Sequence, residues 1–199
     1  MKKLSDIFEF VKLLRNFSGV KRVIFTKDKR WENDSEHSYQ LAMLAWYIVE
    51  SRNLKLNSGL ALKYALVHDL VEVYAGDTYL YTKNRKLRDG KKDRERKAAL
   101  TLKKEFPRFK NLYSLINSYE NLKDRESRFV YALDKVIPMI NIYLGKGDIW
   151  KLKNISLKML IDNKKGKVSL SPAIEKIFDE FVDYLAKNNS KYFGGRGKK

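Results

Sequence analysis

Helical periodicity is the feature of this sequence that most constrains its fold. Apolar residues recur at spacings of three and four along almost the whole chain, and only three prolines and ten glycines interrupt its 199 residues. No segment shows a convincing alternation of the kind that is typical of a strand. The sequence therefore predicts an all-α protein, with helices at about 3–17, 35–52, 58–74, 111–121, 124–143, 147–162 and 172–187 and one more ending near 106.

Several helix starts carry their own signals. Ser35 and Asp124 are residue types that cap helix N-termini, and the Ser171–Pro172 pair places a cap residue before a proline at the first helical position. Residues 18–34 are predicted to be irregular. Residues 83–97 are predicted to form an exposed loop that leads into the next helix.

Length and composition limit the class of protein. A chain of 199 residues indicates one domain, at residues 1–190, and a basic tail at 191–199 that we expect to be disordered. The absence of cysteine excludes disulfides, a thiolate metal site and a cysteine nucleophile. No stretch reaches the roughly 18 uncharged apolar residues that span a bilayer, and the N-terminus lacks a signal-peptide cleavage site. These features agree with a cytoplasmic protein.

The net charge of +18 admits two interpretations. An excess of Lys and Arg suits a nucleic-acid partner, because neutralisation of phosphates dominates non-specific affinity. The basic residues are dispersed, however, and no nucleic-acid-binding motif accompanies them, so solvated Lys-rich helix faces are the favoured interpretation. A small anionic substrate would also be attracted by this positive field.

The chain has only two histidines, His37 and His68, and each stands beside a carboxylate. His68, Asp69 and Glu72 fall near the end of an otherwise apolar helix, where burial of three ionisable groups is unfavourable without a partner. A divalent cation is such a partner, because it neutralises carboxylates and accepts an imidazole lone pair. An exposed helix end, where the same residues meet water, explains the pattern equally well.

Asp134 interrupts a second apolar helix, between Leu133 and Val136. If it points inward it needs a partner, and a salt bridge with Lys135 or a nearby Arg is the alternative to a metal. Two imidazoles and two carboxylates together would make a mixed nitrogen and oxygen site, which suits Mn, Fe, Co, Ni or Zn better than Ca or a bare Mg site. Such a metal acidifies water and polarises a phosphoryl oxygen.

The order of these residues resembles the H…HD…D signature of the HD-domain phosphohydrolases. Three blocks, at 35–38 (SEHS), 68–78 (HDLVEVYAGDT) and 126–135 (ESRFVYALDK), resemble the YfbR-type 5′-deoxynucleotidase branch, and the similarity extends from about residue 5 to 145. The resemblance implies a single HD domain, a helical bundle with its metal site in the core between helices. It also implies a homodimer that hydrolyses nucleoside 5′-monophosphates, preferably deoxy forms. The implied cofactor is one divalent metal such as Co, Mn, Ni, Zn or Fe, with Mg as a further candidate.

The resemblance also implies a role for each site residue. The metal ligands carried over by position are His37, His68, Asp69 and Asp134. Glu72 would position the attacking water and move protons as a general base or acid. Asp77 would lie near the sugar and the leaving oxygen, and Arg22 would bind the phosphate. Arg22, with Lys83 or Lys135, would offset the charge that develops during in-line attack on phosphorus.

The sequence departs from the family pattern at three positions. Val23 stands where one subgroup has tryptophan, so Trp31 or Phe25 would supply a stacking surface instead. Asp34 replaces a small apolar residue, and Tyr79 stands where the family often has proline. These changes leave the four ligands intact and leave base and sugar preference open.

Two other functions are alternatives. A dNTP triphosphohydrolase of the same superfamily would use the same ligands and is distinguished by its product, triphosphate. A basic helical protein with a vestigial metal site would bind DNA or RNA in a salt-dependent manner and hydrolyse no nucleotide. The presence of Glu72 and Asp77 beside the four ligands favours the enzyme.

Overall fold

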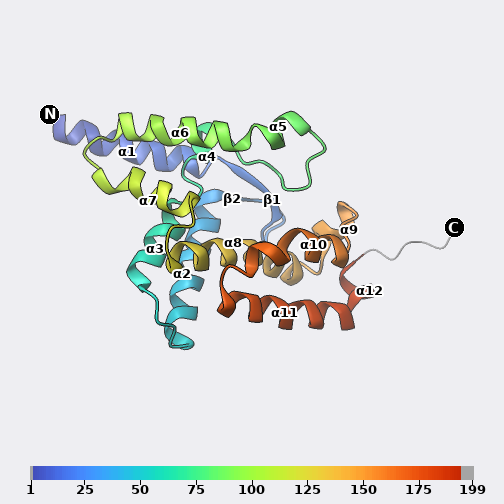
Figure 1. Cartoon of the computed structure of the whole chain (residues 1–199). Coiled ribbons are helices and arrows are strands. Elements are labelled where there is room, and N and C mark those ends of the chain that lie inside the picture. The colour runs from blue at the N-terminus through green and yellow to red at the C-terminus, as the bar shows by residue number, and fades with distance from the viewer. Residues whose placement is uncertain (1, 194–199) are drawn as a thin grey trace.

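The computed structural model describes residues 2–193, which form helices around the long helix α8 and one small sheet (Figure 1). The elements are α1 (Lys2–Phe17), β1 (Lys21–Phe25), β2 (Trp31–Asn33), α2 (Asp34–Ser51), α3 (Ser58–Val67), α4 (Glu72–Ala75), α5 (Arg85–Asp89), α6 (Lys91–Glu105), α7 (Lys110–Glu120), α8 (Arg125–Leu144), α9 (Asp148–Leu152), α10 (Leu157–Val168), α11 (Pro172–Lys187) and α12 (Asn189–Tyr192). The predicted helical fold is therefore confirmed.

The core consists of two clusters of buried apolar side chains. The larger surrounds α8, where Phe129 and Val136 are buried among residues of α2, α3, α10 and α11. The smaller lies among α1, α6 and α7 and contains Leu13 and Leu102. Most of α3 belongs to the larger cluster, whereas Val71, just beyond its end, belongs to the smaller one. The two clusters therefore meet at the end of α3.

The small sheet is the main addition to the predicted fold. Residues 18–34 contain β1 and β2, an antiparallel pair in which the rings of Phe25 and Trp31 stack with centroids 4.4 Å apart. Strands of five and three residues are too short for their alternation to stand out in the sequence. β1 carries Arg22, one of the residues that the resemblance singles out.

Capping boxes fix the starts of α2 and α8. Asn33 and Glu36 exchange side-chain and backbone hydrogen bonds of 3.1 Å at the start of α2. Asp124 and Ser127 make the same exchange at the start of α8. The predicted cap Asp124 is confirmed, and the predicted cap Ser35 is wrong, because Asn33 holds that position. A cap of this type stabilises a helix by about 1 kcal/mol.

The predicted helix at 58–74 is broken in two. α3 ends at Val67, and the four-residue helix α4 begins only at Glu72. Gly76 then has a φ of +72°, a backbone conformation that favours glycine. His68 and Glu72 therefore do not share the face of one continuous helix, as the periodicity suggests. The chain turns here because the residues after α3 pack into the smaller cluster.

Two further segments differ from the sequence prediction. The predicted helix 147–162 is split into α9 and α10 near Asn154, whose φ of +52° cannot continue a helix. A Cβ at Gly147, before α9, would collide with the backbone of Tyr192, so this close approach requires glycine. The basic run 83–97 contains the short helix α5 and the start of α6.

The packed part of the chain extends beyond the predicted boundary at residue 190. Tyr192 and Phe193 are buried, and the Phe193 ring stacks on Trp150 with centroids 4.8 Å apart. Apolar contacts of this kind hold the chain to the core as far as Phe193. The rest of the predicted tail, residues 194–199, lies outside the described residues.

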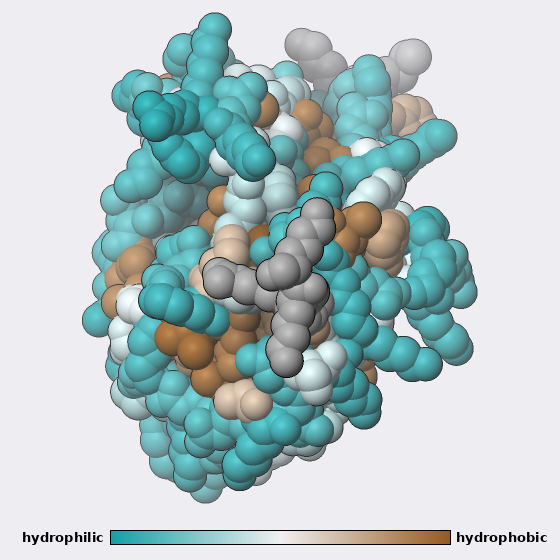
Figure 2. All heavy atoms as spheres, turned by 90° about the vertical axis from the view of Figure 1, so that its right-hand side faces the viewer, coloured by the Kyte–Doolittle hydropathy of each residue, from teal (hydrophilic) through white to brown (hydrophobic). Residues whose placement is uncertain are grey.

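The surface is mostly hydrophilic on the face seen in Figure 2, with apolar side chains in patches between polar ones. Among residues 2–193, no helix is both long enough and apolar enough to cross a membrane. The hydrophilic surface agrees with the interpretation of the +18 net charge as solvated helix faces.

Candidate metal centre

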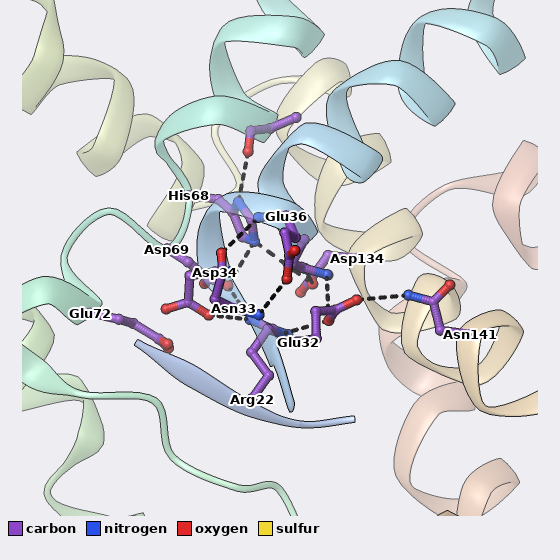
Figure 3. Close-up of polar contacts among 12 residues, drawn as sticks. Arg22, Glu32, Asn33, Asp34, Glu36, His68, Asp69, Glu72, Asp134 and Asn141 are labelled. Carbon is purple, nitrogen blue, oxygen red and sulfur yellow. Dashed lines mark hydrogen bonds and ion pairs between the residues drawn. The ribbon is translucent and has the colours of Figure 1, made fainter. Parts of the chain in front are cut away.

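The candidate metal-binding side chains converge where three helical segments meet β1 (Figure 3). His37 lies in the first turn of α2, and Asp134 lies in the middle of α8. His68 directly follows the last residue of α3, at the junction of the two apolar clusters. Arg22 reaches the same point from β1.

Both imidazoles lie close to Asp134. Nε2 of His37 lies 2.9 Å from Oδ1 of Asp134. Nε2 of His68 lies 2.9 Å from Oδ2 of Asp69 and 3.8 Å from Oδ1 of Asp134. His37, His68 and Asp69 each offer a ligand atom within 4.8 Å of the other two. Four side chains from three separate parts of the sequence therefore lie close together.

The surroundings shift the pKa values of the two imidazoles in opposite directions: burial opposes but does not cancel the charge of Asp69, which raises the pKa of His68, whereas the pKa of His37 is lowered. Nδ1 of His68 lies 2.8 Å from the carbonyl oxygen of Ala65, and because a carbonyl only accepts, this nitrogen carries the proton. The other nitrogen, Nε2, is buried and makes no aligned hydrogen bond within the described residues. Burial, and then the charge of Arg22, lowers the pKa of His37 to about 4, so its ring is neutral at neutral pH. These nitrogens and the adjacent carboxylates fit a divalent metal.

Arg22 lies within a group of carboxylates. Its Nη1 is 2.7 Å from Oδ2 of Asp69 and 3.1 Å from Oδ1 of Asp34. Its Nε is 3.4 Å from Oε2 of Glu32. These contacts use Nη1 and Nε, and within residues 2–193 Nη2 has no carboxylate partner. Arg22 is thus anchored by carboxylates on one side of its guanidinium.

Carboxylates crowd this centre. Burial raises the pKa of Glu32 to about 7. Burial, and then the charge of Asp69, raises the pKa of Asp34 to about 6 and that of Glu72 to about 10. Several buried carboxyls in one place are unfavourable unless cations offset them. A divalent cation would relieve this repulsion.

Glu72 is a buried carboxyl that contacts α6. It is the first residue of α4, and its side chain is 2% exposed. Oε1 lies 3.3 Å from Nζ of Lys91 on α6, while Oε2 is buried without a hydrogen-bond partner among the described residues. Lys91 also lies 3.2 Å from Oε1 of Glu95. α6 thus supplies a cation to the carboxyl that α4 presents.

Asp77 lies in the loop that follows Gly76, and Arg94 of α6 holds this loop. The Arg94 guanidinium donates to Oγ1 of Thr78 at 2.8 Å and to the carbonyl oxygen of Ala75 at 3.3 Å. Asp77 itself is half-buried. Its position therefore depends on a tether from another helix rather than on a helix of its own.

A cavity of about 550 Å³ adjoins these groups. Its polar wall includes Arg22, Asp69, Glu72 and Asp134, and its other wall is formed by the second half of α8 with α9 and α10. The volume lies within the range of small-molecule sites. A larger hollow, of about 780 Å³, lies between α1 and the turn after α6, but it lacks histidine and lies away from these ionisable groups. The chemistry therefore favours the first cavity.

The structure brings together most of the residues that the sequence singles out. The predicted ligands His37, His68, Asp69 and Asp134 meet, and Glu72, Asp77 and Arg22 lie beside them. Lys83 is exposed and does not line the cavity, whereas Lys135 does. Phe25 and Trp31 stack on each other and do not line it either.

Sequence reasoning missed several groups at this centre. Glu32 and Asp34 contact Arg22. Both are close to His37 in the sequence, and Asp34 also departs from the family pattern, but neither signal indicates a contact with Arg22. Lys91 and Glu95 belong to a basic run in which no residue stands out. The contact between Lys91 and Glu72 spans α4 and α6, and the spacing of the residues does not predict it.

Comparison with known proteins agrees with this geometry. The family model described as "HD domain" matches residues 15–177. Human 5′-deoxynucleotidase HDDC2 is 29% identical over 134 residues, which cover 65% of this chain and 63% of the human protein. The protein of the same name from Dictyostelium discoideum is 27% identical over 177 residues, which cover 82% and 90% of the two chains.

A solved structure supports the same relationship. A protein described as a "predicted metal-dependent phosphohydrolase", from Magnetospirillum magnetotacticum MS-1, superposes with a TM-score of 0.81 and 26% identity over 96% of each chain. The chain spans slightly less than two thirds of the human relative's length. The family match nevertheless covers most of this chain, and the side chains of the H…HD…D signature meet at one point. The chain therefore belongs to the HD domain family.

Proposed function

We propose that this protein is a metal-dependent phosphohydrolase that removes phosphate from deoxynucleoside 5′-monophosphates. The observation that carries the proposal is the meeting of His37, His68, Asp69 and Asp134 beside a cavity of about 550 Å³. The relatives named 5′-deoxynucleotidase and the structure described as a phosphohydrolase support it.

Four residues would hold one divalent cation: His37, His68, Asp69 and Asp134. This donor set suits Co, Mn, Ni, Zn or Fe, with Mg as a further candidate. When bound, the cation supplies Lewis acidity, which acidifies water and polarises a phosphoryl oxygen. The bond from Nδ1 of His68 to the Ala65 carbonyl would keep the ring in the orientation that a ligand needs.

Glu72 would move protons during the reaction. Burial, and then the charge of Asp69, raises the pKa of Glu72 to about 10 in the absence of a cation. As a general base or acid, this carboxyl would position the attacking water and move protons. Lys91, 3.3 Å from Oε1, would orient the carboxyl and offset its charge after the proton leaves. Asp77 would lie near the sugar and the leaving oxygen.

Cationic side chains would bind the phosphate. Arg22 would donate from Nη2, while Asp34 and Glu32 hold the rest of its guanidinium. Lys135, which lines the cavity, would offset charge that develops on the phosphate oxygens. Lys83 lies outside the cavity, and Lys91 is proposed in its place.

The proposed enzyme would be a homodimer. One side of α1 exposes Leu4, Ile7, Phe8, Val11 and Leu14, each with 43–61% of its surface accessible. Exposure of a stripe of large apolar side chains to water is unfavourable, and a second copy of the chain would cover it. The cytoplasmic location stays a prediction.

One experiment tests the proposed function. Metal-stripped protein would be reloaded separately with Mn²⁺, Co²⁺, Ni²⁺, Zn²⁺ or Mg²⁺ and screened against nucleoside mono- and triphosphates. We expect release of phosphate from deoxynucleoside 5′-monophosphates. Release of triphosphate from dNTPs would instead support the triphosphohydrolase alternative. Salt-dependent binding of DNA or RNA, with no hydrolysis of any nucleotide, would contradict the enzyme assignment.

A further inference from the structure

The α10 wall of the cavity carries cations that the proposed reaction does not use. Lys164 and Lys167 lie three residues apart on α10, and both line the cavity. From α8 the lining includes Asp134 and Lys135, whereas the lining residues at the end of α8 and from α9 are apolar and include Met139, Ile142 and Trp150. α10 therefore presents two polar side chains to the cavity, and both are lysines.

Lys164 is a buried lysine without a carboxylate partner among residues 2–193. The residue is 5% exposed, and Nζ donates to the backbone carbonyl of Lys135 at 2.7 Å. It forms no salt bridge with any carboxylate of residues 2–193, whereas its neighbour Lys165 is exposed and pairs with Glu175 and Asp179 of α11. A buried charge that lacks a counter-charge is strongly unfavourable.

The groups that face Lys164 are mostly positive. Burial, and then the charge of Lys135, lowers the pKa of Lys164 to about 7. Lys167 and Arg22 act in the same direction, and only Asp134 opposes them. An anion among these groups would offset both the burial of the ammonium and its repulsion by the other cations.

A structural role explains only part of this arrangement. Pro138 lies within α8, and because proline lacks an N–H, the carbonyl of Asp134, four residues earlier, loses its helical partner. Lys164 donates to the next carbonyl along the helix, that of Lys135, so it holds α10 against α8 near this proline. An ammonium has three N–H donors, so two remain after this bond. Lys167 donates to Oδ1 of Asn163 at 2.9 Å and likewise keeps two.

We infer that Lys164 and Lys167 form an anion subsite that binds a phosphate group at the α10 wall of the cavity. The inference rests on the proposed function for the identity of the ligand as a nucleotide. The phosphate group that binds there would be either the one that is removed or a second phosphate on the same nucleotide, as in a nucleoside 3′,5′-bisphosphate.

Titration with inorganic phosphate tests the subsite directly. The full chain would be titrated calorimetrically, with and without added Mn²⁺, alongside Lys164→Met and Lys164→Arg. Lys165→Met is the matched control, because that residue is adjacent but pairs with α11 instead of lining the cavity. We expect Lys164→Met to weaken phosphate binding by about tenfold, Lys164→Arg to retain most of it, and Lys165→Met to change it by less than about twofold.

Equal phosphate affinity in the wild type and Lys164→Met would overturn the inference, as would equal losses in Lys164→Met and Lys165→Met. Thermal unfolding checks that each variant is folded. If Lys164→Met is unfolded, Lys167→Met provides the same test, because Lys167 is only half-buried.

Kinetics distinguish the two sources of phosphate. A preference for a deoxynucleoside 3′,5′-bisphosphate over the 5′-monophosphate in kcat/KM, lost in Lys164→Met, would assign a second phosphate to the subsite. Equal losses of kcat/KM for the two substrates in Lys164→Met would indicate that the subsite binds the phosphate that is removed. If the wild type hydrolyses no nucleotide, the proposed function fails, while the titration still decides whether the subsite exists.

Discussion

The helix pair α2 and α8 and the segment 68–78 build the same centre in different ways. α2 and α8 have 18 and 20 residues, begin with capping boxes and bury apolar faces in the larger cluster. The segment 68–78 contains only the four-residue helix α4, which has no side-chain cap, and a glycine with positive φ. Lys91 and Arg94 of α6 hold it from outside.

This difference suggests that the two regions would have different functions in the proposed reaction. The helix pair places Nε2 of His37 and Oδ1 of Asp134 2.9 Å apart, which would set the position of the proposed metal. The segment would add the other two proposed ligands and also Glu72 and Asp77, which would act on the substrate. A segment with little regular structure is expected to open more readily than long packed helices. We therefore expect changes in α8 to affect metal retention and changes in Glu72 to affect turnover alone.

The largest expected effect on activity is that of a substitution in α8, one helix of the pair. Asp134→Asn should lose bound metal and reduce phosphate release by about 10⁴-fold, because loss of the cation removes several kcal/mol of transition-state stabilisation. Metal content by mass spectrometry and phosphate release would be measured together. The control is Asp162→Asn, which alters an exposed ion pair on α10. Normal metal content in Asp134→Asn would show that α8 does not supply a ligand.

Glu72→Gln should separate turnover from metal retention. The amide keeps the shape of the carboxyl but cannot transfer its proton, so kcat should fall by about 10²- to 10³-fold. Bound metal should stay at the wild-type level, since Glu72 is not among the four proposed ligands. If metal is lost in parallel with activity, the division between the two regions breaks down and Glu72 acts as a ligand.

The two regions also differ in how well the sequence predicts them. The periodicity and the Asp124 cap predicted α8, and the resemblance placed four ligands that the structure brings together. The break after Val67 was missed, because the buried residues Leu70 and Val71 continue the helical spacing. Contacts between elements, such as Lys91 with Glu72, depend on tertiary packing and leave no signal in the spacing of residues.

Arg94→Met should make the segment 68–78 more mobile without altering the proposed metal ligands. It removes the bonds to Thr78 and Ala75, so Asp77 should lose its fixed position and kcat/KM should fall by about tenfold. Hydrogen exchange should become faster at residues 75–78 and stay unchanged in α8. Arg96→Met, on an exposed part of the same helix, is the matched control. Unchanged exchange in Arg94→Met would mean that the loop is held by other contacts.

The smallest expected effect concerns stability, at the contact between α10 and α8. Burial, and then the charge of Lys135, lowers the pKa of Lys164 from 10.5 to about 7; Lys167 and Arg22 lower it further, and Asp134 raises it. Above pH 7 the unfolded chain therefore binds a proton that the folded chain has released, so folding becomes more favourable as the pH rises. The free energy of unfolding of the wild type should gain about 1 kcal/mol relative to Lys164→Met between pH 7 and 8. Urea unfolding of both proteins at several pH values measures this difference. Parallel pH profiles would mean that Lys164 stays charged in the folded protein and that its ammonium already has an anionic partner.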